Sequence, residues 1–321
     1  MLKLGNTKSW DPMTVKNKMH VLLLKGGHGS EREVSLKSAQ ACANALRNAN
    51  IEVTEFDIAS MDISDLINIK ADVCFNALHG DSGENGTIQG LLNLLKLPYT
   101  HSGVEASAIA MNKIYCKSII TSATQNTNDP IKFPKTLEIT TDGQLKDQNY
   151  KGPCVIKPLR GGSSVGVKII KNYELLPSLQ FNHKELMAEV FVGTKELTVT
   201  VLKDKPLCVT EIKAQNNEDF YNYQAKYEKY GSFHKIPANI PQLINEKAMS
   251  WALRAHNIIG CKGISRSDFR YDDKNNQLYL LEINTQPGMT DTSLSPEQAL
   301  HCNISFEEMI KILIDEASYE C

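Results

Sequence analysis

Residues 20–110 repeat one pattern, in which an apolar strand, a glycine-rich turn and a helix follow one another. The pattern predicts strands at 20–24, 51–58 and 72–78 and helices at 35–49 and 86–97. Strands separated by helices pair in parallel, and the functional loops of such sheets lie beyond the carboxyl ends of the strands. We therefore expect a parallel α/β unit whose ligands bind at one edge of its sheet.

The pattern changes after a predicted helix at 111–123. Short β-rich runs follow, separated by turn residues, namely PCVIKP, VGVKII, ELMAEVFV, ELTVTVL and KPLCVTEIK. Such runs predict antiparallel sheet rather than further parallel strands. Residues 218–241 fit no clean period, so we predict a long functional loop there.

The C-terminal part mixes helices and strands. A helix is predicted at 242–257, strands at 262–272 and 277–284, and a last helix from Ser305, which forms a capping-box pattern with Glu308. The 321 residues exceed what one compact core usually holds. We expect an N-terminal extension at 1–19, a parallel α/β domain at 20–102, and central and C-terminal α+β domains at 103–193 and 194–321.

Charge and hydropathy exclude several classes of protein. With 35 Lys and Arg against 37 Asp and Glu, no overall basic field favours nucleic acid or an anionic membrane. Apolar runs are far shorter than the roughly 18–20 residues of a membrane span. The first twenty residues lack the apolar core of a secretory signal, so we expect a cytoplasmic protein. The eight cysteines show no C-x-x-C pair or zinc-like spacing, which predicts mostly core residues.

The segment KPLRGGSSVG at 157–166 can form neither a packed strand nor a stable helix. Its glycines and serines between two predicted strands, preceded by Lys157, suit a loop that folds over an anion such as a triphosphate. It is not a P-loop, because G-x-x-x-x-G-K-[ST] is absent. The alternative is an exposed hairpin loop without function.

A second set of polar residues lies on two predicted strands, RSD at 266–268 and EIN at 282–284. Residues two apart on a strand point to one face, so neighbouring strands would bring Asp268, Glu282 and Asn284 together. Three hard oxygen ligands suit Mg²⁺ that bridges nucleotide phosphates. The alternative is a structural ion pair between Arg266 and a carboxylate.

Two further segments carry charge beside predicted elements. GGHGSEREVS at 26–35 places Glu31 where a helix N-terminus points into the crevice of the sheet. The alternative is that these charged residues only occupy the first turn of the helix and have no function beyond helix stability. QAKYEKYGSFHKIP at 224–237 contains lysines, such as Lys226, that could close over phosphate. A solvated basic face is the alternative reading of that charge run.

In their order along the chain, these features resemble those of the D-alanine:D-alanine ligases of the ATP-grasp superfamily. The resemblance runs from about residue 20 to the C-terminus. It rests on the blocks GSEREVSLKSA, FNALHGDSGENGTIQGLL, PYTHSGVEASAIAMNK, VIKPLRGGSSVGV, EVFVGTKELTV, YNYQAKY, GISRSDF and LLEINTQPGMTDTSLSP.

The resemblance implies the ATP-grasp fold, with ATP between the central and C-terminal domains. It implies that one D-alanine carboxylate attacks the γ-phosphate of ATP and that the amine of a second D-alanine then displaces phosphate from the D-alanyl phosphate. The products are D-alanyl-D-alanine, ADP and phosphate, for peptidoglycan precursor synthesis. The implied partners are D-alanine, ATP and a second copy of the chain in a homodimer, without nucleic acid or membrane.

The same resemblance assigns residues to the nucleotide and its metal. Three lysines hold the ATP phosphates, namely Lys113, Lys157 and Lys226. Two acidic residues read adenine and ribose, namely Glu189 and Glu196. The ligands of Mg²⁺ or Mn²⁺, with two ions in the site, are Asp268, Glu282 and Asn284.

Further residues are assigned to the two amino acids. Glu31 holds the ammonium group of the first D-alanine, and His79 lies near that subsite. Ser163 and Tyr227, with Glu31, link the first substrate to the closing loop. Arg266 and the backbone N–H of Gly288 stabilise the tetrahedral intermediate. The carboxylate of the second substrate is held at Ser293 and Leu294.

The sequence departs from the usual family pattern at four places near these sites, one of which is the tyrosine loop, which reads YNYQAKY instead of an acidic version. Asn112 stands where the family usually has Asp, His101 where glycine is usual, and Gly161 where an acidic residue is common. Competing hypotheses are another ATP-grasp carboxylate–amine ligase with a different acceptor and a catalytically silent nucleotide-binding module. A silent module should have lost a metal ligand or Arg266, whereas Tyr227 favours D-alanine as the acceptor.

Overall fold

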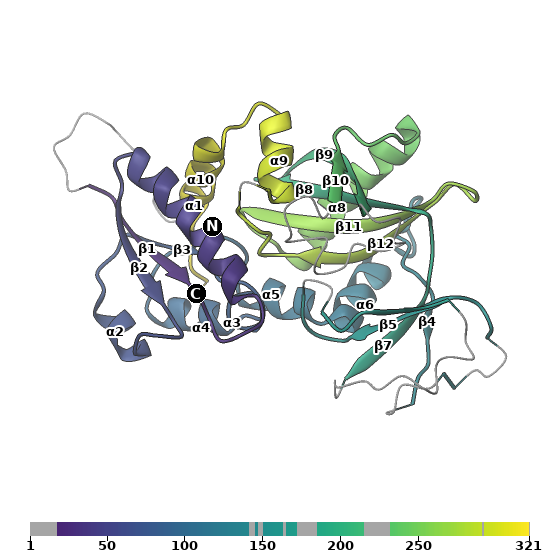
Figure 1. Cartoon of the computed structure of the whole chain (residues 1–321), viewed down its shortest axis with the longest axis horizontal. Helices are drawn as coiled ribbons and strands as arrows, with labels where there is room; N and C mark the ends of the chain where they lie inside the picture. Colours follow the sequence, from purple (N-terminus) through teal and green to yellow (C-terminus); the bar gives the residue numbers. More distant parts are fainter. Residues whose placement is uncertain are drawn as a thin grey trace, which may run out of the picture.

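The structure is a computed structural model that describes residues 18–140, 145–146, 150–162, 165–171, 185–214, 232–290 and 292–320. These residues form three separate sheets (Figure 1). No helix among them combines the length and the hydrophobicity that a membrane crossing requires.

The first sheet is parallel, as predicted. Its strands lie in the order β2-β1-β3, with β1 at His20–Lys25, β2 at Glu52–Asp57 and β3 at Val73–Asn76. The central run of β1 is apolar on both faces because both are buried in separate clusters, one with helix α1 (Arg32–Asn48) and one with α4 (Thr87–Leu94). Two short helices were not predicted, α2 (Ile63–Asn68) and α3 (Asp81–Glu84).

The second sheet is small and antiparallel, with strand order β4-β7-β5-β6. Its strands are β4 (Thr136–Leu137), β5 (Cys154–Pro158), β6 (Lys168–Ile170) and β7 (Leu186–Val190). Strands β5 and β6 form a hairpin. The glycine-rich segment that begins at Lys157 connects them, as the sequence predicted.

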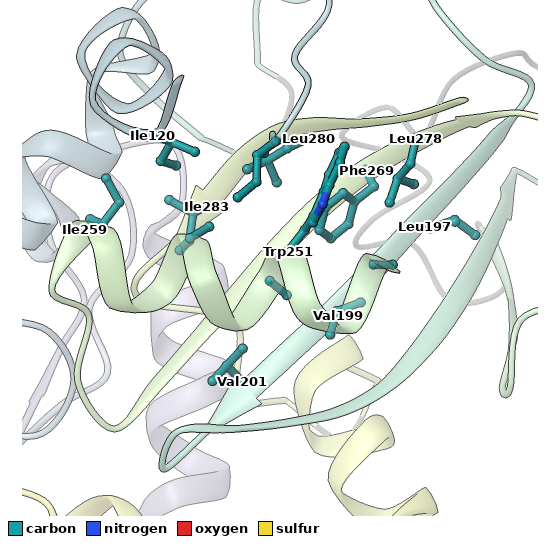
Figure 2. Packing of buried hydrophobic residues seen from close by; sticks show 14 of the residues in the cluster. Ile120, Leu197, Val199, Val201, Trp251, Ile259, Phe269, Leu278, Leu280 and Ile283 are labelled. Atoms are coloured by element: carbon teal, nitrogen blue, oxygen red, sulfur yellow. The ribbon is translucent and has the colours of Figure 1, made fainter. Parts of the chain in front are cut away.

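The third sheet is antiparallel and has the strand order β10-β9-β8-β11-β12. Its strands are β8 (Lys195–Leu202), β9 (Lys205–Ala214), β10 (Ser232–Lys235), β11 (Ile264–Asp272) and β12 (Gln277–Asn284). Helix α8 (Gln242–Ile259) covers one face and buries Trp251 against Phe269 and Leu280 (Figure 2). The charged side chains of β11, namely Arg266, Asp268 and Arg270, alternate with Phe269 and so lie on the opposite face.

The expected loop at 218–241 was wrong in part, because β10 pairs with β9 inside it. The strand has four residues and mixes polar with aromatic side chains, so its sequence carries no clear period of two. Residues 218–231 of that predicted loop lie outside the described residues.

Several helices pack across the expected domain boundaries. Helices α5 (Val104–Met111) and α6 (Lys113–Thr124) join the core of the third sheet. After α9 (Leu294–His301), helix α10 (Phe306–Asp315) packs beside α1 on the first sheet, where the two helices lie together in Figure 1. The predicted cap of α10 is confirmed, since the Ser305 hydroxyl accepts the Glu308 N–H at 3.1 Å.

Candidate active site

A pocket lies between the two antiparallel sheets. Strands β5 and β7 of the small sheet form part of its lining, and β8, β11 and β12 of the larger sheet form another part. The predicted site residues in this lining are Lys113, Lys157, Glu189, Glu196, Asp268 and Glu282. The pocket therefore brings together side chains predicted separately from distant segments.

Strands β11 and β12 are neighbours, which the predicted metal site required. Asp268 pairs in register with Glu282, and Arg266 pairs with Asn284. The register shifts after Asp268, so that Leu281 is an extra residue on β12. This bulge lets Leu281 and Glu282 both line the pocket although they are adjacent in sequence.

Asp268 also makes the ion pair that the alternative reading proposed. Its Oδ1 and Oδ2 accept hydrogen bonds from Arg266 Nε and Nη2 at 2.9 and 2.7 Å, and the Thr198 hydroxyl donates to Oδ1 at 2.7 Å. The carboxylate is 8% exposed, and such a charge needs compensation. The ion pair supplies this compensation while Asp268 still lines the pocket.

The strand pair offers donors of the kind that Mg²⁺ binds: two carboxylates and one amide oxygen. Lys113 Nζ lies 3.7 Å from Glu282 Oε2, and Asn284 Oδ1 accepts the Gln286 N–H at 2.7 Å. A carbonyl oxygen has two lone pairs, so this hydrogen bond does not exhaust the Asn284 side chain. Within the described ranges, no group of three or more His, Cys, Asp or Glu side chains is arranged for a metal.

Lys113 is the first residue of α6 and donates from Nζ to the Gly161 carbonyl at 2.7 Å. A cation at a helix N-terminus opposes the helix dipole, so this position is not explained by helix stability. Asn112 caps the helix by accepting the Tyr115 N–H at 3.2 Å. Asn112, which stands where the family usually has Asp, therefore still caps the helix. The first residue of that helix, Lys113, lines the pocket.

Glu189 is 3% exposed and binds two lysines. Lys157 Nζ lies 2.7 Å from Oε2, and Lys117 Nζ lies 2.8 Å from Oε1. Burial alone would raise the pKa of the Glu189 carboxyl, but the two ammonium groups outweigh it and lower the pKa. Lys117 was missed by the sequence reasoning, although its spacing of four from Lys113 places both on one face of α6.

Glu196 and Arg270 also line the pocket, and they pair with each other on β8 and β11. Arg270 Nη1 lies 3.5 Å from Glu196 Oε2, and its guanidinium stacks 4.8 Å from the centre of the Phe191 ring. Arg270 also donates to the Val192 and Gly193 carbonyls. Arg270 was not predicted, although it follows Asp268 by two residues and so shares its face of the strand.

A second pocket lies between the loop after β1 and the glycine-rich segment, and Glu31, Gly80 and Gly162 line it. Gly80 has φ 72°, a conformation that favours glycine, and a Cβ there would lie 2.7 Å from Glu31 Oε2 and so displace that carboxylate. A Cβ on Gly162 would lie 3.5 Å from both Glu31 carboxylate oxygens and 3.8 Å from Glu84 Oε2. The glycine-rich segment therefore touches the subsite predicted for the first amino acid.

His79 lies behind this subsite, buried and held in a short chain of polar contacts. Its Nδ1 is 3.4 Å from Glu84 Oε1, and its Nε2 is 3.1 Å from the Ser38 hydroxyl. Glu84 Oε1 also accepts the Gly80 N–H at 3.0 Å. Glu84, which the sequence reasoning missed, thus connects His79 to the backbone beside Glu31.

The loop that carries Glu31 is tied to the sheet by Arg32. Its two Nη atoms donate to the two Asp57 carboxylate oxygens at 2.9 and 2.6 Å. These hydrogen bonds lower the pKa of Asp57 to about 2, from an ordinary 3.8. Arg32 therefore has a structural role at the carboxyl end of β2.

Replacing Asp57 by Asn is expected to flatten the pH dependence of stability at acid pH. Because the folded-state pKa is depressed, the carboxylate stabilises the fold fully above its ordinary pKa, and this contribution is lost as pH falls towards about 2. Urea unfolding of the wild type and of Asp57→Asn, from neutral pH down to about pH 2, gives the free energy of unfolding of each protein. Asp65→Asn, on the exposed side of α2, is the control, and parallel curves for Asp57→Asn and the wild type would contradict the assignment.

The N-terminus of α9 carries the residues predicted to hold the second substrate's carboxylate. The Ser293 hydroxyl accepts the Thr290 N–H at 3.0 Å, and a Cβ on Gly288 would lie 2.8 Å from the same hydroxyl oxygen. The Leu294 side chain is buried against Ile212, so only its backbone can serve a ligand. Glycine at 288 thus leaves room for Ser293, which was predicted to hold a carboxylate.

The parallel sheet is joined to this C-terminal segment by a pair of amides. Asn76, at the end of β3, donates from Nδ2 to Gln286 Oε1 at 3.3 Å, and Gln286 Nε2 donates to the Asn76 carbonyl. Met289 N–H donates to the Ser38 hydroxyl that contacts His79. The subsite near Glu31 and the segment that carries Gly288 are therefore held together.

His101 keeps the backbone conformation of the glycine that is usual at its position. Its φ is 73°, which costs a non-glycine residue roughly 1–2 kcal/mol. The ring is buried edge-on against Phe75, and Nδ1 lies 2.8 Å from the Thr100 hydroxyl. Burial lowers the pKa of His101 to about 3, so the ring is neutral at pH 7.

Three predicted site residues lie outside the described residues, namely Ser163, Lys226 and Tyr227. Gly161, on one side of Ser163, has φ 106° and lines both pockets. The absence of the usual acidic side chain at 161 thus fits a backbone conformation that favours glycine.

Comparisons with known proteins point to one family. A family model for the D-ala D-ala ligase C-terminus matches residues 136–315, and one for the N-terminus matches residues 62–102. The D-alanine--D-alanine ligase of Gluconobacter oxydans is 42% identical over 307 residues, which cover 93% of this chain and 99% of that protein. The corresponding ligase of Caulobacter vibrioides is 44% identical and covers 94% of each chain.

Solved structures agree with this likeness. The D-alanine--D-alanine ligase of Bacillus anthracis superposes with a TM-score of 0.77 at 28% identity, over 93% of this chain and 97% of that one. The VanG D-Ala:D-Ser ligase of Enterococcus faecalis, at 24% identity, shares the fold with a TM-score of 0.76, over 93% of this chain and 99% of that one. The expected ATP-grasp architecture, with a parallel sheet followed by antiparallel ones, is thus confirmed.

Proposed function

The chain belongs to the D-alanine–D-alanine ligase family, and on that premise we propose that it joins two D-alanine molecules with ATP. The products are D-alanyl-D-alanine, ADP and phosphate, and the dipeptide serves peptidoglycan precursor synthesis. One observation carries the proposal within the molecule: the glycine-rich segment lines both the pocket of Lys113 and Lys157 and the pocket of Glu31. A phosphate donor and a carboxylate acceptor can therefore meet beneath it.

The nucleotide belongs in the pocket between the two antiparallel sheets. Lys113 and Lys157 provide positive charge for the phosphates, and Glu196 lines the same pocket with its partner Arg270, which also contacts Phe191. Phosphoryl transfer needs positioning and neutralisation of charge more than covalent participation by the protein. The D-alanine carboxylate oxygen attacks the γ-phosphorus, and the bond to the β–γ bridging oxygen breaks to release ADP.

Asp268, Glu282 and Asn284 are the residues that would hold Mg²⁺ or Mn²⁺, and their oxygen donors fit such ions. Bound there, the metal would neutralise charge on the phosphate oxygens. Lys113 and Arg266 balance the two carboxylates in the present arrangement. The number of ions, two by family resemblance, is part of the proposal.

The second D-alanine attacks the carbonyl of the D-alanyl phosphate through its amine. The C–N bond forms first and gives a tetrahedral intermediate with an oxyanion. Its collapse restores the C=O bond and breaks the C–O bond to phosphate, and the amine proton leaves to solvent or phosphate. Arg266 and the Gly288 N–H are the proposed donors to the developing oxyanion, where fixed donors act strongly. The N-terminus of α9 with Ser293 is the proposed position of the acceptor carboxylate.

Glu31→Gln is expected to raise KM for the first D-alanine by about tenfold to a hundredfold, because a charge-assisted hydrogen bond contributes ~1.5–3 kcal/mol. KM for ATP should be unchanged, since Glu31 lines the other pocket. Steady-state kinetics with both substrates varied give the two constants. Glu33→Gln, an exposed change in the first turn of α1, is the matched control; a selective rise in KM for ATP would remove Glu31 from its proposed role.

The identity of the acceptor is the part of this function that could differ between this chain and a relative with the same fold. The VanG protein is named for D-serine as its second substrate, and another acceptor is the alternative for this chain. Tyr227 supports D-alanine by family resemblance. A catalytically silent module is the weaker alternative, because Arg266, Asp268, Glu282 and Asn284 are all present and adjacent.

The domain boundaries, the homodimer and the cytoplasmic location stay predictions from the sequence. Each of the three sheets falls within one of the proposed domains at 20–102, 103–193 and 194–321. The helices α5, α6 and α10 cross those divisions in their packing, so the proposed domains would share cores.

An isotope experiment tests the proposed reaction. D-alanine labelled with heavy oxygen in its carboxylate is incubated with ATP and Mg²⁺, and the dipeptide and the released phosphate are analysed by mass spectrometry. One labelled oxygen should appear in each phosphate released, because the attacking oxygen leaves with phosphorus. Dipeptide accompanied by unlabelled phosphate would contradict the acyl phosphate step.

A further inference from the structure

Lys117 lies one helical turn after Lys113 on α6 and binds the same carboxylate as Lys157. Lys117 Nζ is 2.8 Å from Glu189 Oε1, and Lys157 Nζ is 2.7 Å from Glu189 Oε2. Lys157 lines the nucleotide pocket, whereas Lys117 is not among the described residues that line it. The two ammonium groups therefore approach one buried carboxylate from different sides.

Lys117 is fixed from outside the pocket. Its Nζ donates to the Thr136 hydroxyl at 2.7 Å and to the Pro134 carbonyl, and it lies 5.8 Å from the centre of the Phe133 ring. Three contacts, two from the segment just before β4 and one from β4 itself, thus hold the ammonium group in one place. A lysine so held is a permanent partner for Glu189 rather than a mobile one.

Lys157 must be able to leave Glu189, because its proposed role is to bind phosphate. If Glu189 had Lys157 as its sole cation, moving that ammonium to a phosphate would leave a buried carboxylate without a counter-charge, which is costly. With Lys117 in place, Glu189 keeps a partner when Lys157 turns to the nucleotide. The pair of lysines also leaves one positive charge in excess over Glu189, directed at the pocket.

We propose that Lys117 is a positioning residue that serves as the standing counter-ion of Glu189 and so makes the Lys157 ammonium available to the triphosphate. This inference rests on the proposed nucleotide site but not on the acceptor chemistry. Lys117 would thus determine ATP affinity although it is not among the described residues that line the pocket. It predicts an effect on the phosphates and not on the nucleoside.

The test measures ATP and adenosine binding by competition with a fluorescent ATP analogue, in the full chain without amino acid. Lys117→Met should weaken ATP binding by about tenfold to a hundredfold, the range seen when the partner that orients a binding group is lost. Adenosine binding should be unchanged. Lys117→Arg should retain ATP affinity, because it keeps the charge; Lys37→Met, on an exposed part of α1, controls for loss of any helical lysine.

A double variant separates this role from a merely structural one. Lys117→Met combined with Glu189→Gln removes the carboxylate that would capture Lys157, so the ratio of ATP to adenosine affinity should recover towards the wild type. Equal weakening of ATP and adenosine in Lys117→Met, or no recovery in the double variant, would overturn the proposal. Because binding is measured without turnover, a failure of dipeptide synthesis would leave this test intact.

Discussion

Asp268→Asn is expected to lower kcat/KM for Mg-ATP by ~10²- to 10³-fold, the loss that removal of one charge-stabilising group produces. Asp268 lies opposite Glu282 on β11, is 8% exposed and lines the nucleotide pocket. Asn keeps the shape of the side chain but removes the charge on which a divalent cation depends. Initial rates of ADP formation over a range of Mg²⁺ concentrations measure the effect.

The same substitution at Asp273 is the matched control. Asp273 lies in the turn between β11 and β12, where it accepts a hydrogen bond from the Thr194 hydroxyl at 2.8 Å. Asp273→Asn should have near-normal kinetics. Near-normal rates for Asp268→Asn at saturating Mg²⁺ would mean that this strand pair is not the metal site.

Arg266→Met is expected to lower kcat by a similar ~10²- to 10³-fold, because the guanidinium is a proposed donor to the oxyanion of the tetrahedral intermediate. ATP affinity should change little, since Arg266 is not among the described residues that line the nucleotide pocket. Single-turnover measurement of dipeptide formation, alongside ATP binding, gives the two effects separately. A loss confined to ATP affinity would contradict the role in the second step.

The two substitutions should not be additive, because Arg266 and Asp268 form one ion pair with Nη2 to Oδ2 at 2.7 Å. Removing Arg266 leaves Asp268 with an unbalanced charge that Thr198 can satisfy only in part. The double variant should therefore lose less activity than the product of the single losses. Strict additivity would show that the pair acts as two independent groups.

Much of the site could be predicted from the sequence where function depends on strand periodicity. Arg266, Asp268, Glu282 and Asn284 share a face because residues two apart on a strand do, and the pairing of β11 with β12 needed only a short turn between them. The ion pair offered as the alternative to a metal site is also present. The ion pair is therefore confirmed, and the metal site stays a prediction.

Residues that act across distant segments were not predicted. Lys117 meets Glu189, 72 positions later in the chain, and Glu84 reaches the subsite of Glu31 through a helix of four residues. No local period links such residues, and their roles depend on how the sheets are packed. Arg270 was also not predicted, although its spacing of two from Asp268 on β11 places both on the pocket face.

The overall fold was likewise predictable in part: sheet type followed from the sequence, and helix packing did not. Sheet type followed from the change between helix-separated and turn-separated strands, and it is confirmed in all three sheets. The packing of α10 on the first sheet and of α6 on the third could not be read from periodicity, because an amphipathic helix indicates that it has a partner but not which one. Linear domain limits therefore describe the sheets better than the helices.

The most direct test of the proposed function is phosphate release from Mg-ATP with D-alanine, L-alanine, D-serine, D-lactate or no addition, with the mass of each product determined. We expect release with D-alanine and a D-alanyl-D-alanine product, and little release with L-alanine or without an amino acid. No release with D-alanine, from protein shown to be folded and to bind ATP, would contradict D-alanine ligation and indicate that the chain uses its ATP-grasp fold on a different acceptor.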